Sequence, residues 1–434
     1  MRATPTILRV ALGLAFAGIV IKAASSDLTW DEAWTYLFYG RTPLGFTVLD
    51  YANDHPLNSI LIWASTRMFG NSEFIIRIPN VLAGGLYLYS CARLIGAVRV
   101  KLLAFALCVL QPYLLDYFAL ARGYGIAAAL VQSGLVAHFF VPRPRPWLML
   151  ACCLLASLTV FSTVVVLYAL LGSLTLTAVI ARSAATRRSS SVIATGSPRR
   201  DAPRDDGWER RGSPLAAMTA LFGLLGLIPV VGLLRVSREG LPLYGSTAGF
   251  FDATVRGVAR MYAPDAWSTA VAVVILLGLA ALLVGGLRCF GRRAATLMLA
   301  SAAALGATWL SARVLGKPLP TGRLLLPSVP LWNLTVIAMA EDIRVAAGGL
   351  GRRATAAFGP VLCIVLGVIF LHKLHFQRYS DWPQDYRLQN RLVQALAAGK
   401  CLPPDVWERY GHVYYLDRWF PPDRRPADVR CPPP

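Results

Sequence analysis

Long apolar segments alternate with short polar ones along most of this chain, and the pattern predicts membrane-spanning helices. A helix needs about 20 mainly apolar residues to cross a bilayer, and about eleven segments approach that length. The expected spans are residues 6–24, 74–95, 101–116, 123–141, 147–160, 162–182, 214–235, 267–287, 294–312, 324–341 and 356–372. The stretch 147–182 is too long for one span and barely long enough for two. We therefore expect an all-α polytopic membrane protein.

Basic residues gather in alternate polar segments, and this distribution predicts the sidedness of the protein. Cytoplasmic loops of membrane proteins carry an excess of Lys and Arg. With a cytoplasmic N-terminus, the arginine-rich segments 93–101, 143–145, 183–213, 288–293 and 344–353 all fall on the cytoplasmic side. The opposite face then receives residues 25–73, 236–266, 313–323 and 373–434. Residues 25–55 carry five carboxylates against one arginine, which agrees with an extracytoplasmic position.

The domain organisation follows from these segments. Residues 1–372 form one transmembrane domain, and its first apolar stretch is an uncleaved helix, because Lys22 would sit badly beside a signal-peptide cleavage site. Residues 183–213 contain too few apolar side chains to pack, so we expect a disordered cytoplasmic loop. Residues 373–434 mix aromatic residues with prolines and predict a small extracytoplasmic tail.

The first extracytoplasmic loop, residues 25–73, is too broken by charge to span a membrane. The stretches "DEAWTYLFYG" and "PLNSILIWASTRMFG" predict short amphipathic helices that lie on the membrane surface. Pro56 suits the first turn of the second helix, where its missing N–H costs nothing. The adjacent carboxylates of Asp31 and Glu32 therefore lie at the outer mouth of the helix bundle.

Composition and charge narrow the class of protein further. The chain is 56% hydrophobic and has a net charge of +20. Its arginines flank apolar spans, so the charge indicates membrane sidedness and argues against nucleic-acid binding. No CxxC motif or His/Cys cluster indicates zinc. Cys401 and Cys431, in the tail, could form a disulfide or remain free thiols.

Asp31 and Glu32 are the first candidates for chemistry. Neighbours on a helix point about 100° apart, so one carboxylate can face a cavity while the other binds a partner. A carboxylate shielded by Trp30, Trp34 and Tyr36 suits a general base. The alternative is a solvated pair that marks the edge of the membrane.

Other charged and polar residues fall on the same predicted face. A single arginine near the end of a span can simply reach the interface. Carboxylates and guanidinium groups that converge, however, indicate a site that binds an anion and removes a proton. The candidates are Asp31, Glu32, Asp54, His55, Arg77, Asp116, Arg122, Tyr124, Lys317 and Arg323.

The order of these motifs resembles the GT-C superfamily of polyprenyl-phosphate-sugar glycosyltransferases, in particular the family 39-like protein O-mannosyltransferases and the lipid A aminoarabinose transferases. The matching motifs are Asp31-Glu32, His55-Pro56-Leu57, Arg77-Ile78-Pro79, Ala121-Arg122-Gly123-Tyr124, and Arg323 to Pro327. They cover roughly residues 6–135 and 313–332. Leu57 replaces a usual proline and Asn80 a usual serine, and a histidine common near the fifth and sixth spans is absent. These departures leave the subfamily and the substrate open.

The resemblance implies a GT-C-like bundle of about eleven spans and an extracytoplasmic, inverting glycosyltransferase in the inner or plasma membrane. An enzyme of this family would transfer a hexosyl or pentosyl group from a polyprenyl-phosphate donor to a hydroxyl of a lipid, glycan or protein acceptor. Asp31 resembles the family's general base, with Glu32 as the second catalytic carboxylate. Donor phosphate contacts are expected from Arg122, Tyr124, Lys317 and Arg323. Acceptor or accessory roles are expected for Asp54, His55, Asp116 and Arg77.

Some relatives need a divalent cation and others do not, so we assign no cofactor and no metal site. The rival class is a polytopic transporter or flippase of lipid-linked sugars. It predicts ionisable residues near the span centres and inverted repeats, whereas the charges here gather at one face. A third reading is a non-catalytic membrane subunit that binds lipid phosphate.

Overall fold

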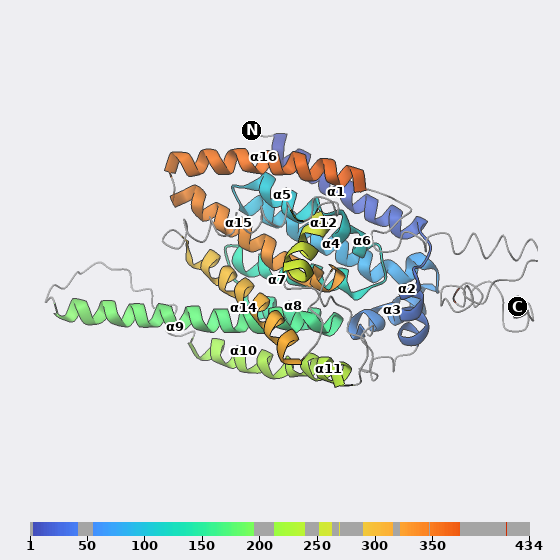
Figure 1. The fold of residues 1–434 in the computed structure, drawn as a ribbon, viewed down its shortest axis with the longest axis horizontal. Helices are drawn as coiled ribbons and strands as arrows, with labels where there is room; N and C mark the ends of the chain where they lie inside the picture. Colours follow the sequence, from blue (N-terminus) through green and yellow to red (C-terminus); the bar gives the residue numbers. More distant parts are fainter. Residues whose placement is uncertain are drawn as a thin grey trace, which may run out of the picture.

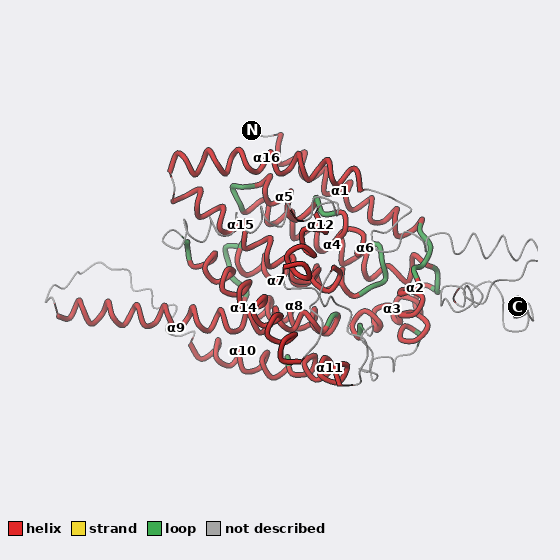
Figure 2. The backbone as a smooth tube through the Cα atoms, in the orientation of Figure 1, coloured by secondary structure: helices red, strands yellow, loops and turns green. Residues whose placement is uncertain are grey.

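The computed structural model describes residues 3–41, 55–194, 212–238, 251–262, 269, 290–315, 322–346, 348–373 and 414. Every element within these ranges is a helix (Figures 1 and 2), which confirms the all-α prediction for this part of the chain. The longer helices are α1 (Ala3–Ser25), α4 (Glu73–Ala97), α5 (Lys101–Val109), α7 (Gly123–Phe139), α8 (Pro146–Thr159), α9 (Val164–Ala194), α10 (Gly212–Leu225), α11 (Leu227–Arg238), α14 (Arg292–Leu315), α15 (Val329–Ala346) and α16 (Gly348–Lys373).

The other helices occupy the segments between them. They are α2 (Trp30–Trp34), η1 (Thr35–Gly40), α3 (Pro56–Phe69), α6 (Pro112–Phe118), η3 (Phe161–Thr163), η5 (Phe251–Val255), α12 (Arg256–Tyr262) and η6 (Gly322–Ser328). The two helices predicted in the first loop are therefore present as α2 with η1 and as α3, and Pro56 lies at the start of α3 as expected.

The described residues include five helices that are long and apolar enough to cross a membrane, or six if one bent pair counts as a span. They are Thr6–Ser25, Glu73–Ala97, Phe161–Ile180, Arg292–Leu310 and Gly322–Ala346, with Lys101–Val109 and Pro112–Phe118 as the bent pair. Shorter apolar helices lie at Gly123–Phe139, Pro146–Thr159, Ala217–Val231 and Ala356–Leu371. The expected span 267–287 lies outside the described residues, residue 269 excepted.

The span predicted at 101–116 is two helices, α5 and α6, which meet at an angle of 58°. Pro112 explains the break, because proline has no N–H and disfavours helical backbone at the residue before it. Gln111 accordingly has an extended φ of −127° and ψ of 88°. The bend points α6 towards the end of α1, where Asp116 meets Lys22.

Helix α9 also departs from the prediction. The break that we placed near residue 161 is present, since α8 ends at Thr159 and the short η3 precedes α9. However, α9 continues to Ala194, into the segment 183–213 that we expected to be a disordered loop. Ala and Arg form helices readily, and each residue added to an existing helix gains a hydrogen bond. Figure 1 shows α9 projecting beyond the other helices.

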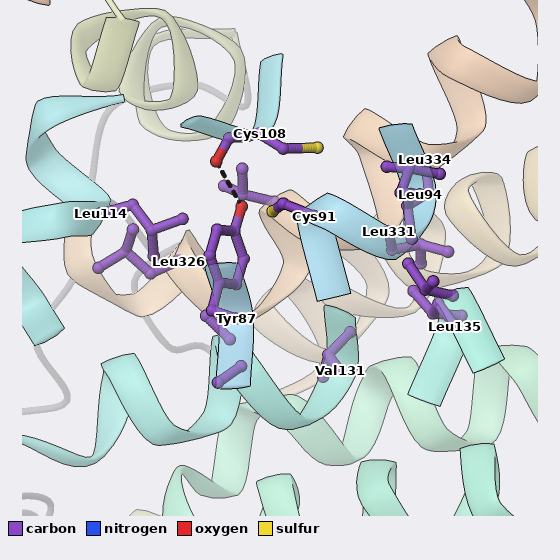
Figure 3. Close-up of a cluster of buried hydrophobic side chains, with 14 of the residues drawn as sticks. Tyr87, Cys91, Leu94, Cys108, Leu114, Val131, Leu135, Leu326, Leu331 and Leu334 are labelled. Carbon is purple, nitrogen blue, oxygen red and sulfur yellow. Dashed lines mark hydrogen bonds between the residues drawn. The ribbon is translucent and has the colours of Figure 1, made fainter. Parts of the chain in front are cut away.

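Helices α4 and α7 lie at the centre of the molecule and pack against each other, and α7 also packs against α8. The core between them is apolar with a few satisfied polar groups. The Tyr87 hydroxyl, fully buried, donates a hydrogen bond of 2.8 Å to the Cys108 carbonyl (Figure 3). Gly134 allows α7 to approach α8, since a Cβ there would lie 2.9 Å from the Cβ of Cys152.

Candidate active site

Helix α2 begins with a capping box, and both candidate carboxylates lie buried in its first turn. The Thr29 side chain accepts a hydrogen bond from the Glu32 backbone N–H, and the Glu32 side chain accepts one from the Thr29 N–H. This arrangement satisfies N–H groups that the first turn of a helix leaves without partners. Asp31 is 3% exposed and Glu32 is 0% exposed, so the pair is not a solvated marker of the membrane edge.

Glu32 is fully engaged by its neighbours. Arg77 donates to both of its oxygens, Nε to Oε1 and Nη2 to Oε2, each at 2.8 Å. The Ala121 N–H donates to Oε1 at 2.7 Å, and the Thr29 N–H occupies Oε2. Each oxygen therefore accepts two hydrogen bonds, which leaves no lone pair to take a proton. Glu32, predicted as the second catalytic carboxylate, is thus held on both oxygens by the surrounding segments.

Arg77 completes this buried pair. Its guanidinium group, 0% exposed, also bonds the backbone at the end of α1. The acceptors are the carbonyl oxygens of Ala23, Ser26 and Asp27. Arg77 thereby ties α4 to the turn that leads into α2. The acceptor or accessory role predicted for Arg77 stays a prediction, and the contacts that the structure shows for Arg77 are with Glu32 and the end of α1.

Asp31 points to a different set of partners. Its Oδ2 accepts a hydrogen bond of 2.6 Å from Nη1 of Arg323, and Nη2 of Arg122 lies 3.5 Å away. Among the described residues, none donates a hydrogen bond to Oδ1. Two arginines from distant parts of the chain thus meet the Asp31 carboxylate in a site where Asp31 and Arg122 are almost completely buried. Guanidinium groups held close together in this way are suited to bind the oxygens of an anion.

Arg122 is held in place by groups of α2 and the first residue of η1. Its Nη1 donates to the Asp31 carbonyl and to the Thr35 hydroxyl, both at 3.2 Å. The residue before it, Ala121, is bound by Glu32 through its N–H and by Asn58 through its carbonyl. The Glu32–Arg77 pair therefore positions the arginine that faces Asp31.

His55 and Tyr124 extend the site beyond Arg122. The His55 and Tyr124 rings meet edge to face with 5.1 Å between their centroids, and the Tyr124 ring lies 5.9 Å from Cζ of Arg122. His55 Nδ1 lies 2.9 Å from the Thr159 carbonyl oxygen. Burial lowers the pKa of His55 well below its usual value, and the charge of Arg122 lowers it further. The His55 imidazole is therefore neutral.

Of the remaining candidates, the structure describes Asp116. Asp116 pairs with Lys22 at 2.5 Å, and both side chains are largely buried. Asp54 and Lys317 lie outside the described residues. Within the ranges that the structure describes, no group of three or more His, Cys, Asp or Glu side chains could hold a metal ion.

Sequence reasoning missed several polar residues that hold the cluster together. Asn80 donates to the Asn58 side chain at 3.0 Å, and Asn58 donates to the Ala121 carbonyl. Both asparagines are fully buried. Asparagine inside an apolar helix was the available signal, because a buried amide needs partners. Asn80, noted only as a departure from a family motif, fastens α4 to α3.

Fold and site together define a class: a protein whose described elements are all helices, some of them long enough to cross a membrane, with two arginines gathered around one buried carboxylate. No family model matches the chain, and no curated protein or solved structure matches it. The function proposed below therefore rests on the geometry of this cluster.

Proposed function

We propose that this protein is an integral membrane glycosyltransferase of the GT-C type, which transfers a sugar from a polyprenyl-phosphate donor to an acceptor hydroxyl. The observation that carries the proposal is Asp31, buried between Arg122 and Arg323. This places a proton acceptor directly beside a cationic pair. The reaction requires both, because a hydroxyl must lose a proton while a phosphate departs with added negative charge.

The arginines serve the leaving group. A guanidinium group binds two phosphate oxygens with its planar fork and stays charged at any relevant pH. In a buried site such charges stabilise a developing anion far better than they do in water. Arg122 is preorganised by Asp31 and Thr35, so little rearrangement is needed when the donor binds. Lys317 and Tyr124 remain predicted phosphate contacts.

Asp31 serves the acceptor. In the proposed step, the bond between the anomeric carbon and the phosphate oxygen breaks as the acceptor oxygen bonds to that carbon from the opposite side. The hydroxyl proton passes to the Asp31 carboxylate, and polyprenyl phosphate leaves with the bonding electron pair. A single displacement of this kind inverts the anomeric centre. Donor phosphate competes with Asp31 for Arg323, so donor binding frees Oδ2 to act as the base.

The location of the site supports access for both substrates. Helices α2 and α3 lie at one end of the helix bundle (Figure 1). We propose that the bundle has about eleven spans and that this end faces the extracytoplasmic side of the membrane. Tyr414, from the C-terminal region, donates to the Asn71 carbonyl and packs edge to face on Tyr36. Its position agrees with a tail on the same side as the first loop. A lipid-linked donor reaches this end from the bilayer, and an acceptor from water.

The experiment compares Arg323→Gln with the matched control Arg313→Gln, an exposed arginine near the end of α14. Purified protein in nanodiscs receives polyprenyl-phosphate-linked mannose, glucose, arabinose, galacturonic acid or an aminosugar, with membrane extract as acceptor. Loss of a charge-assisted phosphate contact should lower transfer by about 10- to 100-fold in Arg323→Gln, and Arg313→Gln should match wild type. Absence of transfer by the wild type from every donor contradicts the proposal.

The bent pair of α5 and α6 favours one second candidate, a flippase for lipid-linked sugars. Broken helices with buried polar residues often form transport sites, and Gln111 at the bend is fully buried. The two functions are distinguished by reconstituting the protein in vesicles that contain the same donor lipids. A flippase moves the lipid across the bilayer and leaves the sugar attached, whereas a transferase releases polyprenyl phosphate.

A further inference from the structure

His55 carries a polar atom that the protein itself leaves without a partner. The side chain is 2% exposed, and within the described ranges its Nε2 makes no hydrogen bond. Nδ1 faces the Thr159 carbonyl, which can only accept, so Nδ1 carries the proton. This assignment from the hydrogen-bond network leaves Nε2 with a free lone pair. Buried polar groups of proteins nearly always find a partner, so a bound ligand is one means of satisfying this lone pair.

The same helix carries two further atoms of this kind. Ser59 Oγ and Trp63 Nε1 are also buried without hydrogen-bond partners in the part of the chain that the structure describes. His55, Ser59 and Trp63 recur at four-residue spacing, which places them along one face of α3 and its N-cap. The row combines an acceptor, a hydroxyl and an N–H donor. A ligand with several hydroxyl groups matches such a mixture, since each hydroxyl both donates and accepts.

The surroundings of His55 exclude other ligand groups at Nε2. A carboxylate would bring acceptor oxygens against an acceptor nitrogen. An ammonium group would enter a region where Arg122 and Arg323 both lie near enough to lower the pKa of His55. A neutral hydroxyl donates to the lone pair without either penalty. In a donor whose sugar is attached directly to the phosphate, the sugar hydroxyls lie within a few bonds of the group that these arginines would bind.

We propose that Nε2 of His55 accepts a hydrogen bond from a hydroxyl group of the donor sugar and thereby selects neutral sugars over uronic acids and aminosugars at that position. This inference rests on the proposed function and adds to it a specificity-determining residue and a substrate class. Ser59 and Trp63 extend the same row for the remaining hydroxyls.

The test uses His55→Asn, with His55→Gln as the matched variant. The asparagine amide can take the place of Nδ1 and keep the bond to Thr159, but it does not reach the position of Nε2. The longer glutamine amide reaches that position and can restore an acceptor. The probes are the polyprenyl-phosphate sugar that wild type transfers best, its monodeoxy analogues, and the corresponding uronic acid.

We expect one deoxy analogue to be transferred by wild type with a kcat/KM about 10- to 100-fold lower than the full sugar. His55→Asn should show a similar loss on the full sugar but little further loss on that analogue, and His55→Gln should recover part of the activity. Such non-additivity identifies a direct contact. Wild type should also prefer the neutral sugar to the uronic acid, and His55→Asn should weaken that preference.

Three results would overturn the inference. A wild type that transfers every deoxy analogue as well as the full sugar has no such contact, and this measurement does not depend on any variant folding. Equal losses of His55→Asn on all analogues indicate a purely structural histidine. A preference of wild type for the uronic acid contradicts the substrate class. If wild type transfers no sugar at all, the proposed function itself fails, which is a distinct result.

Discussion

Glu32 and Asp31 are adjacent, yet their side chains serve different parts of the molecule. Glu32 and Arg77 form an ion pair in which both side chains are 0% exposed. Asp31 instead lies against Arg122 and Arg323, where we propose that the donor phosphate binds. The first pair fixes the backbone from which the second cluster is built, because Glu32 also binds the N–H of the residue before Arg122.

Replacement of Arg77 by Met tests the structural role of this pair. It leaves Glu32 charged, buried and without its main partner. Breaking a buried pair in this way costs about 3–5 kcal/mol, so we expect the free energy of unfolding in detergent to fall by that amount. Arg256→Met is the control, because its partner Asp252 is 52% exposed and exposed pairs contribute about 1 kcal/mol or less. Equal effects of the two variants would contradict the account.

His55 makes a prediction about pH. Its pKa in the folded protein lies well below the usual 6.5, owing to burial first and Arg122 second. As the pH falls through that usual value, the unfolded chain binds a proton that the folded protein does not, so stability is lost. Thermal unfolding of wild type should therefore shift to lower temperature between about pH 7.5 and about pH 5.5. His55→Asn should shift less, and an identical shift in both proteins would refute a buried neutral imidazole.

At the residue scale, the sequence predicted which residues carry charge at this end but not their pairing. The angle between neighbours on a helix correctly allowed Asp31 and Glu32 separate tasks. Their partners could not be assigned, because Arg77 lies 45 positions from Glu32 and Arg323 lies 292 positions from Asp31. Such pairing depends on tertiary packing that no local pattern encodes. For the same reason the ion pair of Asp116 with Lys22, 94 positions away, was not predicted.

At the scale of elements, helix contacts depend on small residues. Lipid is as apolar as the helices, so close packing drives helix association in membranes. Gly134 of α7 lies against Met149 and Cys152 of α8, and a Cβ there would come within 3.1 Å of the Met149 Cα. Gly172 of α9 has nothing within 4 Å of its Cβ position. The two glycines thus offer a matched comparison.

Gly134→Ala should destabilise the protein by about 1–3 kcal/mol, because the added methyl group meets the backbone of α8. Gly172→Ala should be neutral or stabilise by up to about 1 kcal/mol, since alanine is the better helix former. Unfolding in detergent, followed by circular dichroism, measures both changes. Similar stabilities for the two variants would show that α7 and α8 are not in close contact.

The sequence predicted most described elements but not their ends. Apolar length located α1, α4 and α14, and the break before α9 was placed within a few residues of η3. The bend between α5 and α6 was missed because apolar residues continue on both sides of Pro112. The polar end of α9 was read as disorder, although helix propagation needs no apolar residue.

At the scale of the whole molecule, the proposed function requires the site to lie on the extracytoplasmic side of the membrane. Arg41 is exposed and follows η1, close to the site, whereas Arg352 is exposed in the first half of α16. A membrane-impermeant thiol reagent added to intact cells should label Arg41→Cys above the level of the unsubstituted protein. Arg352→Cys should be labelled only after permeabilisation. The reverse pattern would place the site on the cytoplasmic side.

The most direct test of the central claim is the rate of sugar transfer in a single turnover by Asp31→Asn. Asparagine keeps the shape of the side chain but cannot take up the acceptor proton. The account predicts that the variant still binds the donor and transfers the sugar at least about 10²-fold more slowly than wild type. Asp342→Asn, at the far end of α15, should transfer normally because Asp342 lies away from the cluster and accepts a hydrogen bond from the Gly291 N–H. Transfer by Asp31→Asn at the wild-type rate would contradict the assignment of Asp31 as the base.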